Sequence, residues 1–344
     1  MKQQDILSMT LPELQTAVQE LGEPKFRAKQ IFNWLHQKRV TDFSEMTTLS
    51  LPFRERLASD FCINRLKIAK RLASSVDDTV KYLYELPDGN YVETVCMQYH
   101  HGTSLCISTQ VGCRMGCRFC ASAIAGFVRN LTPAEMLLQI YETERAQNCK
   151  ISSLVLMGIG EPLDNFDNVL RFLQLLSEPN GYGMSLRHVT VSTCGVVPKI
   201  LELAEQRLGL TLSVSLHCPN DAGRSAIMPI NRSYPIDVLL DACQTYFEKT
   251  GRRVTFEYAV MEQVNSAEQD AAALAERLKG LHAHVNLIPI NPVKERNFHT
   301  LKKTVLQFQK TLERYGIPAT IRRTLGSDIE AACGQLRRDA IQQT

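Results

Sequence analysis

The chain has 344 residues, of which 44% are apolar and 22% are charged. These fractions are close to the averages for soluble globular proteins and argue against a disordered, collagen-like or coiled-coil chain. No stretch approaches the roughly 18 uninterrupted apolar residues that a membrane span needs, and the first residues lack an apolar signal core. We therefore expect a cytoplasmic protein with one large or two smaller domains.

The formal net charge of +3 lies entirely at the N-terminal end of the chain. Residues 1–70 hold 11 Lys and Arg against 8 Asp and Glu, whereas the remainder holds 28 of each. This is a mild bias toward a polyanionic partner, although the basic residues are as well explained by a solvated helix face. Apolar residues recur here at helical spacing, with breaks at Gly22-Glu23-Pro24 and Leu51-Pro52, which predicts a module of short helices.

From Asp78 onward the pattern changes to the period of β-strands. Alternation over 80–86, a turn at 87–90 and a second run at 91–95 predict a β-hairpin, and a third strand at 104–108 leads into a cysteine-rich loop. Beyond that loop, strand-like and helix-like segments alternate, which indicates parallel βαβ units. The expected strands lie near 153–157, 188–193, 211–216, 253–260 and 284–289, with a final strand at 319–322.

The first helix after the cysteine-rich loop has a clear start, because Thr132 can cap it, Pro133 fits the first position and Glu135 completes a capping box. The strand at 104–108 and the five strands between 153 and 289 make six, which are fewer than a closed eight-stranded barrel of about 250 residues requires. The sequence therefore predicts an α/β fold with a partial (βα)6 barrel. We expect a helical accessory module at 1–75, a β-hairpin extension at 76–103, the partial barrel at 104–325 and a C-terminal tail at 326–344.

Three cysteines form the strongest motif of the chain. The eleven cysteines are not a disulfide framework, because the count is odd and the cytosol keeps thiols reduced. Cys113, Cys117 and Cys120 stand in a C-x3-C-x2-C run, and no second CxxC pair exists to complete a structural zinc site. Three thiolates suit a [4Fe-4S] cluster whose fourth iron is open to a ligand. A zinc site completed by His217 or another residue is the less favoured alternative.

The cysteine spacing resembles that of the radical S-adenosylmethionine (SAM) superfamily, in which the open iron chelates the amino and carboxylate groups of SAM. The position agrees, because barrel chemistry collects at the C-terminal ends of the strands. The segment Met157–Pro162 is similar to the superfamily's Gly-Gly-Glu-Pro turn. The resemblance therefore implies SAM contacts from this turn and from further strand ends: Gly160, Glu161, Ser192, Ser215, Leu216, His217 and Asn291.

A narrower resemblance, to the RlmN/Cfr family of radical SAM ribosomal RNA adenine methyltransferases, spans nearly the whole chain. The matching segments are 91–95, 113–120, 127–131, 158–162, 224–231 and 328–336. The family implies methylation of an adenine in the peptidyl-transferase centre of 23S rRNA and, for many members, of an adenosine beside the tRNA anticodon. It also implies an RNA-binding front module, one [4Fe-4S] cluster, two SAM molecules per turnover and an electron donor such as a flavodoxin-type protein.

The chemistry of that family explains why cysteines beyond the cluster are needed. Carbon 2 of adenine is electrophilic, so it cannot attack the methyl sulfonium of SAM directly. In the family, a cysteine near the C-terminus takes a methyl group from one SAM, a radical made from a second SAM removes hydrogen from that methyl group, and the carbon radical adds to the ring. A second cysteine then opens the enzyme–RNA thioether by forming a disulfide, which must be reduced in each turnover.

Three residues match the family's reacting positions. Cys333 matches the methyl-carrying cysteine, Cys106 the resolving cysteine, and Glu93 a proposed general base. Without the resemblance, the two cysteines are ordinary buried thiols and Glu93 is an exposed carboxylate on a hairpin strand. The sequence leaves open whether Glu93 or Cys106 takes the ring proton.

Two alternatives accompany the prediction of a carbon-2 methyltransferase. The nearest rival methylates carbon 8 of the same adenine and would confer antibiotic resistance, although the segments 158–162 and 288–292 look closer to the carbon-2 type. A rival of another class is a non-enzymatic RNA-binding protein with a structural metal, but such a scaffold needs neither a three-cysteine site nor the glycine–glutamate turn. We expect phosphate contacts from the basic front helices, from Arg129 and from the basic residues of the tail, Arg322, Arg323, Arg337 and Arg338.

Overall fold

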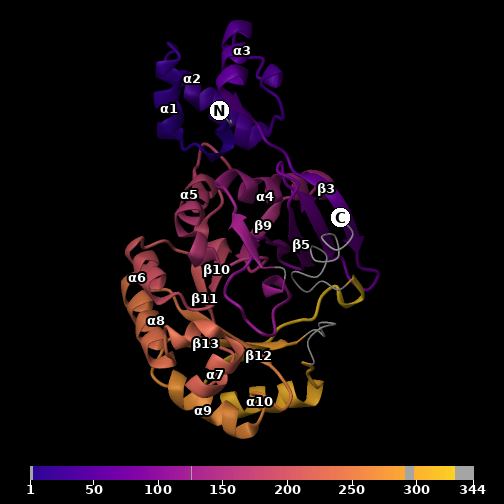
Figure 1. Cartoon of the computed structure of the whole chain (residues 1–344), viewed down its shortest axis with the longest axis vertical. Helices are drawn as coiled ribbons and strands as arrows, with labels where there is room; N and C mark the ends of the chain where they lie inside the picture. The colour runs from indigo at the N-terminus through magenta and orange to yellow at the C-terminus, as the bar shows by residue number, and fades with distance from the viewer. Residues whose placement is uncertain (1–2, 125, 291–297, 330–344) are drawn as a thin grey trace.

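The computed structural model describes residues 3–124, 126–290 and 298–329. Within these residues, ten strands form one sheet in the order β14-β13-β12-β11-β10-β9-β6-β5-β4-β3. The indigo N-terminal module lies at one end of the elongated molecule, beyond the purple strands (Figure 1). The sheet combines an antiparallel part, β3 to β6, with a parallel part that runs from β6 to β14.

The N-terminal module contains the short helices that the sequence predicts. Thr10 caps the first of them through a capping box with Glu13, whose carboxylate accepts from the Thr10 amide at 2.8 Å. A short parallel pair, β1 and β2, joins the two ends of the module. The elements are β1 Gln4–Asp5, α1 Leu11–Glu20, α2 Phe26–Asn33, α3 Leu51–Asp60 and β2 Phe61–Cys62.

The antiparallel part confirms the predicted hairpin and adds a strand that the sequence pattern misses. Strand β4 (Val80–Glu85) pairs with β5 (Tyr91–Tyr99), and β5 pairs with β6 (Gly102–Cys106). The additional strand β3 (Lys67–Ala73) pairs with β4 at the edge of the sheet. Nearly all of its side chains are exposed, so it lacks the alternation of apolar and polar residues that marks a half-buried strand.

The parallel part confirms the predicted α/β fold with an incomplete barrel. Each strand from β6 to β14 is parallel to the next, and their order in the sheet follows their order in the chain. Their C-terminal ends therefore meet at one edge, where ligands bind in such folds. The strands are β9 Ile151–Leu156, β10 Val189–Thr193, β11 Thr211–Ser215, β12 Val254–Val260, β13 Ala283–Pro289 and β14 Ala319–Ile321.

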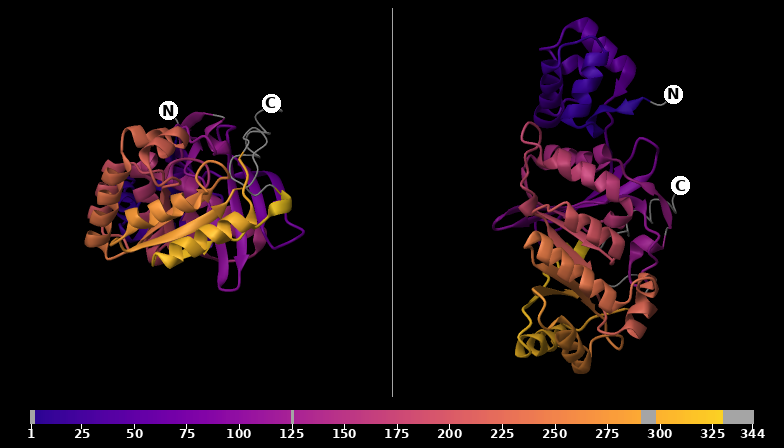
Figure 2. Two further views of the ribbon diagram at one scale, coloured as in Figure 1. Left: turned by 90° about the horizontal axis from the view of Figure 1, so that it is seen from below. Right: turned by 90° about the vertical axis from the view of Figure 1, so that its left-hand side faces the viewer.

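Helices connect these strands and cover the sheet. The orange and yellow helices in the second half of the chain lie along one side of it (Figure 2), where α6 contacts α8 and α9 contacts α10. The first helix begins with the predicted capping box, in which Thr132 Oγ1 accepts from the Glu135 amide at 3.2 Å. The helices are α4 Pro133–Gln147, α5 Phe166–Ser177, α6 Val197–Glu205, α7 Asp221–Ile227, α8 Ile236–Thr250, α9 Glu268–Leu278 and α10 Lys302–Arg314.

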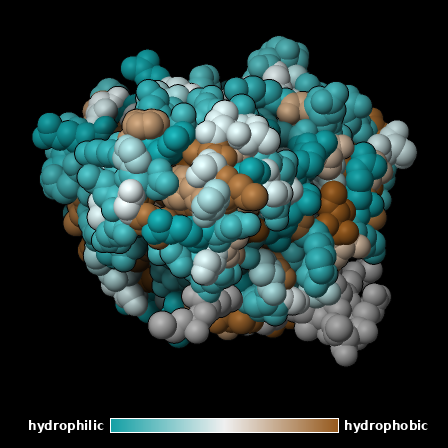
Figure 3. All heavy atoms as spheres, turned by 90° about the horizontal axis from the view of Figure 1, so that it is seen from above, coloured by the Kyte–Doolittle hydropathy of each residue, from teal (hydrophilic) through white to brown (hydrophobic). Residues whose placement is uncertain are grey.

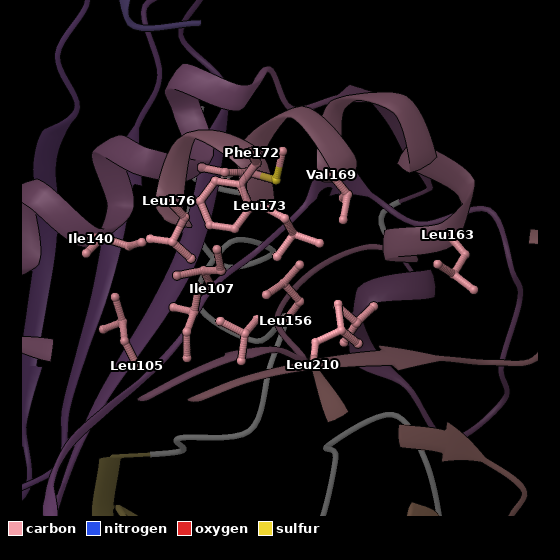
Figure 4. Packing of buried hydrophobic residues seen from close by; sticks show 14 of the residues in the cluster. Leu105, Ile107, Ile140, Leu156, Leu163, Val169, Phe172, Leu173, Leu176 and Leu210 are labelled. Atoms are coloured by element: carbon pink, nitrogen blue, oxygen red, sulfur yellow. The ribbon is translucent and has the colours of Figure 1, made fainter. Parts of the chain in front are cut away.

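A hydrophobic core lies between the helices α4 and α5 and the strands of the sheet. Val169, Phe172, Leu173 and Leu176 recur at helical spacing on α5 and are almost fully buried. They face strand residues such as Leu156 (Figure 4). Burying side chains of this size contributes about 1.5–3 kcal/mol each, so this core stabilises the packing of α5 on the sheet.

The surface at the module's end is mostly hydrophilic, with scattered hydrophobic patches (Figure 3). Phe26 and Leu51 of the module are among the large apolar side chains that remain exposed. Among the helices that the structure describes, none has the length and apolar character needed to cross a membrane.

Candidate active site

A cavity of about 330 Å³ lies at the C-terminal ends of the parallel strands. Its volume is within the range of small-molecule sites. Residues of the cysteine loop, of the antiparallel strand β5 and of the segment after β14 all contribute to its wall. Segments far apart in the sequence therefore converge on one cavity.

The three motif cysteines line this cavity. Cys113, Cys117 and Cys120 are half-buried, and they follow the short strand β7 (Gln110–Gly112), which pairs with β8 (Phe127–Asn130) to bring the two ends of the loop together. Burial, together with the neighbouring thiols, raises the pKa of Cys113 to about 12 and raises that of Cys117 further. The thiols therefore need a cation such as iron to be held as thiolates at neutral pH.

The donor set suits an iron–sulfur cluster. A [4Fe-4S] cluster takes each thiolate on a different iron, so its cysteine ligands stand around a shared space. The half-burial of Cys113, Cys117 and Cys120 around a shared cavity fits three such ligands.

The glycine–glutamate turn packs closely against the end of β6. A Cβ atom on Gly158 would lie 2.6 Å from the Ile107 carbonyl oxygen, and Gly160 has a φ of +113° and a site 2.6 Å from Gln110 Cβ. Gly158 must be glycine because two backbones approach closely there, and Gly160 because its φ is positive and the Gln110 side chain fills the site of a Cβ. The turn is thus locked beside the cysteine loop, with Gly158 and Gly160 both lining the cavity.

Glu161 is buried and ties this turn to the neighbouring strand end. Its carboxylate accepts from the Cys194 amide at 2.7 Å and from the Leu163 amide at 3.0 Å, while its own amide donates to Gln110 Oε1 at 2.8 Å. Burial raises its pKa, and these hydrogen bonds oppose the rise. Gln110, which the sequence analysis did not single out, also donates to Asn130 and Asp164 and so links the cysteine loop to the turn.

The other expected SAM contacts lie at neighbouring strand ends. Ser192, on β10, and Ser215, at the end of β11, line the cavity. Leu216 is fully buried and is not among the lining residues; its amide donates to the Glu257 carbonyl oxygen at 3.1 Å. Asn291 lies outside the described residues.

His217 lines the cavity as a neutral imidazole. Its Nδ1 accepts from the Ala259 amide at 2.9 Å, so the ring proton is assigned to Nε2. Burial lowers its pKa to about 3. The ring also packs edge-on against Phe119 of the cysteine loop, with centroids 4.7 Å apart. His217 therefore joins the loop to the barrel and can donate one hydrogen bond.

Arg224 organises two of these strand ends, although sequence reasoning assigned it no role. This fully buried guanidinium donates to the carbonyl oxygens of Cys194 at 2.7 Å, Ser215 at 3.0 Å and Leu216 at 3.2 Å. It also donates to Asn231 Oδ1 at 2.9 Å. The match of the segment 224–231 to the family was the available signal.

Glu257 is a second residue that the sequence analysis missed. Its buried carboxylate lines the cavity and accepts from Ser213 Oγ at 2.7 Å and from Asn286 Nδ2 at 2.9 Å. Burial raises its pKa. An acidic residue in the mostly apolar strand Val254–Val260 was the signal for an inward-facing polar group.

Cys106 and Glu93 occupy different depths beside the cavity. Cys106 is buried at the end of β6 and lines the cavity. Glu93 is on the same face of β5 as the lining residues Val95 and Met97, but it is not itself a lining residue. Its Oε2 lies 3.0 Å from Nζ of Lys81, and both side chains are buried, so Glu93 is not the exposed carboxylate of the alternative interpretation.

The remaining residues that the sequence predicts lie in the C-terminal segment or near the surface. Cys333, Arg337 and Arg338 lie outside the described residues, whereas Arg322, Arg323 and Leu325 line the cavity. Arg129 pairs with Asp88 at 2.7 Å and with Glu135 at 2.8 Å, and its side chain is 30% exposed. Two carboxylates thus occupy part of its guanidinium, and its contact with phosphate stays a prediction.

The N-terminal module and the central part of the chain match known family models. Residues 4–63 match the ribosomal RNA large subunit methyltransferase N-terminal domain, and residues 107–275 match the radical SAM superfamily. A protein of Lachnoclostridium phytofermentans called probable dual-specificity RNA methyltransferase RlmN is 50% identical, over 99% of this chain and 96% of that protein. A protein of the same description from Alkaliphilus oremlandii is 49% identical, over 99% of this chain and 100% of that protein.

A solved structure is also similar over nearly the whole chain. The crystal structure of a radical SAM methyltransferase from Sphaerobacter thermophilus superposes with a TM-score of 0.92 at 40% identity. The match covers 96% of this chain and 98% of that one.

Proposed function

Because this chain belongs to the RlmN family of dual-specificity RNA methyltransferases within the radical SAM superfamily, we propose that it methylates carbon 2 of adenine in 23S rRNA and in tRNA. The superfamily implies a [4Fe-4S] cluster and SAM as cofactors. One observation carries the proposal: the three motif cysteines, the glycine–glutamate turn and Cys106 all line one cavity. A scaffold with a structural metal has no need of this convergence.

The cysteine loop and the strand ends hold the cofactors in this proposal. Cys113, Cys117 and Cys120 bind three irons, and one iron stays open to SAM. When bound, the cluster and SAM supply the electron and the hydrogen-atom abstraction that the reaction needs. The turn at Gly160 and Glu161 offers backbone carbonyl groups to the amino group of SAM. His217 Nε2–H, Ser192 and Ser215 offer hydrogen bonds to its remaining polar groups, as does Asn291 by resemblance.

Two further cysteines react in this proposal: Cys333 carries the methyl group, and Cys106 releases the product. The Cys333 thiolate takes the methyl group of a first SAM, which leaves as S-adenosylhomocysteine. After one hydrogen atom is removed, the Cys333 methylene carbon bonds to carbon 2, and the ring then loses one electron and one proton. The Cys106 thiolate attacks the Cys333 sulfur, the sulfur–methylene bond breaks toward the RNA carbon, and a proton completes the methyl group. The new disulfide takes two electrons to return to thiols.

The position of Cys106 supports its role more directly than that of Glu93. Cys106 lines the cavity, whereas Glu93 is two residues before the lining residue Val95 on β5 and forms an ion pair with Lys81. We therefore infer that Cys106 contacts the substrate ring. The role of Glu93 as acceptor of the ring proton stays a proposal, and it requires the proton to travel inward from the cavity.

The substrates follow from the relatives, and the electron donor from the resemblance. We propose 23S rRNA and tRNA as substrates, bound in part by the N-terminal module, and a flavodoxin-type protein as donor of single electrons. RNA binding of this kind weakens as salt concentration rises. Nucleoside mass spectrometry of RNA from cells with and without the gene tests the product. Loss of 2-methyladenosine supports the proposal, and loss of 8-methyladenosine instead would assign the protein to the carbon-8 type.

A test with purified protein addresses the chemistry itself. Reconstitution with iron and sulfide without air, followed by reduction with SAM present, is expected to release 5′-deoxyadenosine. The variant Cys333→Ala is expected to keep the cluster and to lose RNA methylation. RNA methylation by this variant would exclude the two-step scheme, and the absence of 5′-deoxyadenosine from the wild type would exclude the radical SAM reaction.

A further inference from the structure

The two edges of the open sheet are joined at the cavity by a contact between distant segments. β3 and β14 are the edge strands of the sheet. The turn 74–79, which follows β3, meets residues 326–328, which follow β14. Figure 1 shows the yellow segment after β14 reaching toward the purple antiparallel strands. The contact closes the side of the barrel that the sheet leaves open.

Four hydrogen bonds make up this contact. The carboxylate of Asp328 accepts from Ser74 Oγ at 2.7 Å, from the Ser75 amide at 2.7 Å and from Ser75 Oγ at 2.9 Å. The Gly326 amide donates to Asp77 Oδ2 at 2.9 Å. Each segment thus contributes one carboxylate, and each carboxylate accepts hydrogen bonds from the other segment. These bonds fix how the two segments are aligned.

The turn is braced independently of the tail. The Ser74 amide donates to the Thr79 carbonyl oxygen at 2.9 Å, and the Thr79 amide donates to Asp77 Oδ1 at 2.9 Å. The hydrogen bonds to Asp328 lower its pKa to about 2, so it is ionised at all physiological pH values. Thr79 and Leu325, one from each side of the contact, also line the cavity.

We propose that the turn 74–79 is an anchor for the root of the C-terminal tail, and that Asp77 and Asp328 are positioning residues for Cys333. This inference rests on the proposed function, because it assigns Cys333 to the chemistry. Cys333 follows Asp328 by five residues, which limits its reach from the anchor to about 17 Å even in an extended chain. Without the anchor, the chain is held only nearer to β14, so more residues separate Cys333 from the last held residue and Cys333 can reach further.

A longer tether has a chemical consequence. The hydrogen-atom abstraction needs the Cys333 methyl group beside the reactive carbon made from SAM, and a misplacement of about 1 Å can lower such a rate by about a hundredfold. SAM cleavage itself does not depend on Cys333. Loss of the anchor therefore separates the two events, and more SAM is cleaved for each adenosine that is methylated.

The test compares Asp328→Ala with Asp78→Ala. Asp78 is exposed, lies within the same turn and makes no hydrogen bond that the structure describes, so its replacement matches the change in charge. We expect Asp328→Ala to release at least about tenfold more 5′-deoxyadenosine per methylated adenosine than the wild type, with unchanged iron content. We also expect faster trypsin cleavage after Arg322 and Arg323. Asp78→Ala is expected to behave as the wild type in both measurements.

A milder variant keeps the proposal testable if Asp328→Ala does not fold. Ser75→Ala removes one hydroxyl donor and keeps the amide donor, so we expect a smaller change in the same direction. An unchanged ratio in both variants, together with faster cleavage after Arg322, would show that the contact holds the root of the tail but would overturn its role in positioning Cys333. Unchanged cleavage and an unchanged ratio would overturn the anchor as well. Failure of the proposed function is distinct, because the wild type itself would then cleave no SAM or carry no methyl group on Cys333.

Discussion

Lys81 and Glu93 form an ion pair inside the sheet, with Nζ 3.0 Å from Oε2 and side-chain exposures of 0% and 2%. The two residues are diagonal neighbours on β4 and β5, since Leu83 is the register partner of Glu93. Removing two charges from water is costly, and their attraction offsets that cost only when both are present. The pair therefore makes Glu93 dependent on Lys81, whatever its part in the reaction.

The first prediction concerns Lys81→Met. This variant leaves the Glu93 charge buried without its ammonium partner, so we expect the free energy of unfolding to fall by about 3–5 kcal/mol. Urea denaturation of the protein, followed by circular dichroism without air, measures the change. A loss below about 1 kcal/mol, the range of exposed ion pairs, would contradict the assigned burial.

The double variant Lys81→Met/Glu93→Leu is the matched control and also tests the ring-proton acceptor. It removes both charges, so we expect it to recover most of the stability that Lys81→Met loses. If the refolded double variant methylates RNA at the wild-type rate, Cys106 or water rather than Glu93 accepts the proton. If the double variant is stable but no longer methylates RNA, this would support Glu93 as the acceptor of the ring proton.

A second prediction concerns Gly160→Ala. The new Cβ would lie 2.6 Å from Gln110 Cβ, in a backbone conformation with a φ of +113° that alanine rarely adopts. Such strain costs about 1–3 kcal/mol, so we expect SAM affinity to fall about tenfold to a hundredfold while iron content is retained. Anaerobic equilibrium dialysis with labelled SAM measures the affinity. Gly183→Ala is the control, because it has a positive φ in open space away from the cavity.

The sequence predicts the parts of this fold that depend on local pattern. The capping box at Thr132, the hairpin and the order of the parallel strands are all found as expected, because caps and periodicity are set by neighbours in the chain. The cysteine spacing likewise indicates a shared site, since the residues are close in sequence. The edge strand β3 is missed because its side chains are exposed on both faces.

Features set by contacts between distant segments are not predictable in this way. The burial of Glu93 depends on Lys81 across the hairpin, and the hydrogen bonds of Arg224 depend on two strand ends of the barrel. The contact between Asp328 and Ser75 joins residues 253 positions apart. Periodicity and spacing carry no signal for such pairs, so their discovery needs coordinates.

A third prediction concerns the pH dependence that His36 imposes. This fully buried histidine contacts the Tyr141 hydroxyl at 2.9 Å, and burial lowers its pKa from 6.5 to about 3. The unfolded chain therefore binds more protons than the folded protein between these values, so stability is lost as the pH falls below 6.5. Between pH 7.5 and pH 5, we expect the free energy of unfolding of the wild type to fall by about 2 kcal/mol more than that of His36→Phe.

The measurement is urea denaturation of both proteins across that range of pH. His100→Phe is the control, because His100 is exposed and its replacement leaves the burial of His36 unchanged. Parallel stability curves for wild type and His36→Phe would contradict a neutral, buried His36. A steeper curve for His36→Phe would reverse the assigned direction of the shift in pKa.

The last prediction concerns Arg224, whose guanidinium donates to carbonyl oxygens of Cys194, Ser215 and Leu216 at once. Arg224→Lys keeps the charge but cannot reach three acceptors from one planar fork. Each carbonyl group left without a donor costs about 1–3 kcal/mol, so the strand ends relax and we expect SAM affinity to fall at least about tenfold with iron retained. Arg232→Lys, at an exposed position five residues from the end of α7, is the control. Equal SAM affinity in the Arg224→Lys and Arg232→Lys variants, measured by anaerobic equilibrium dialysis, would show that the strand ends hold their shape without this guanidinium.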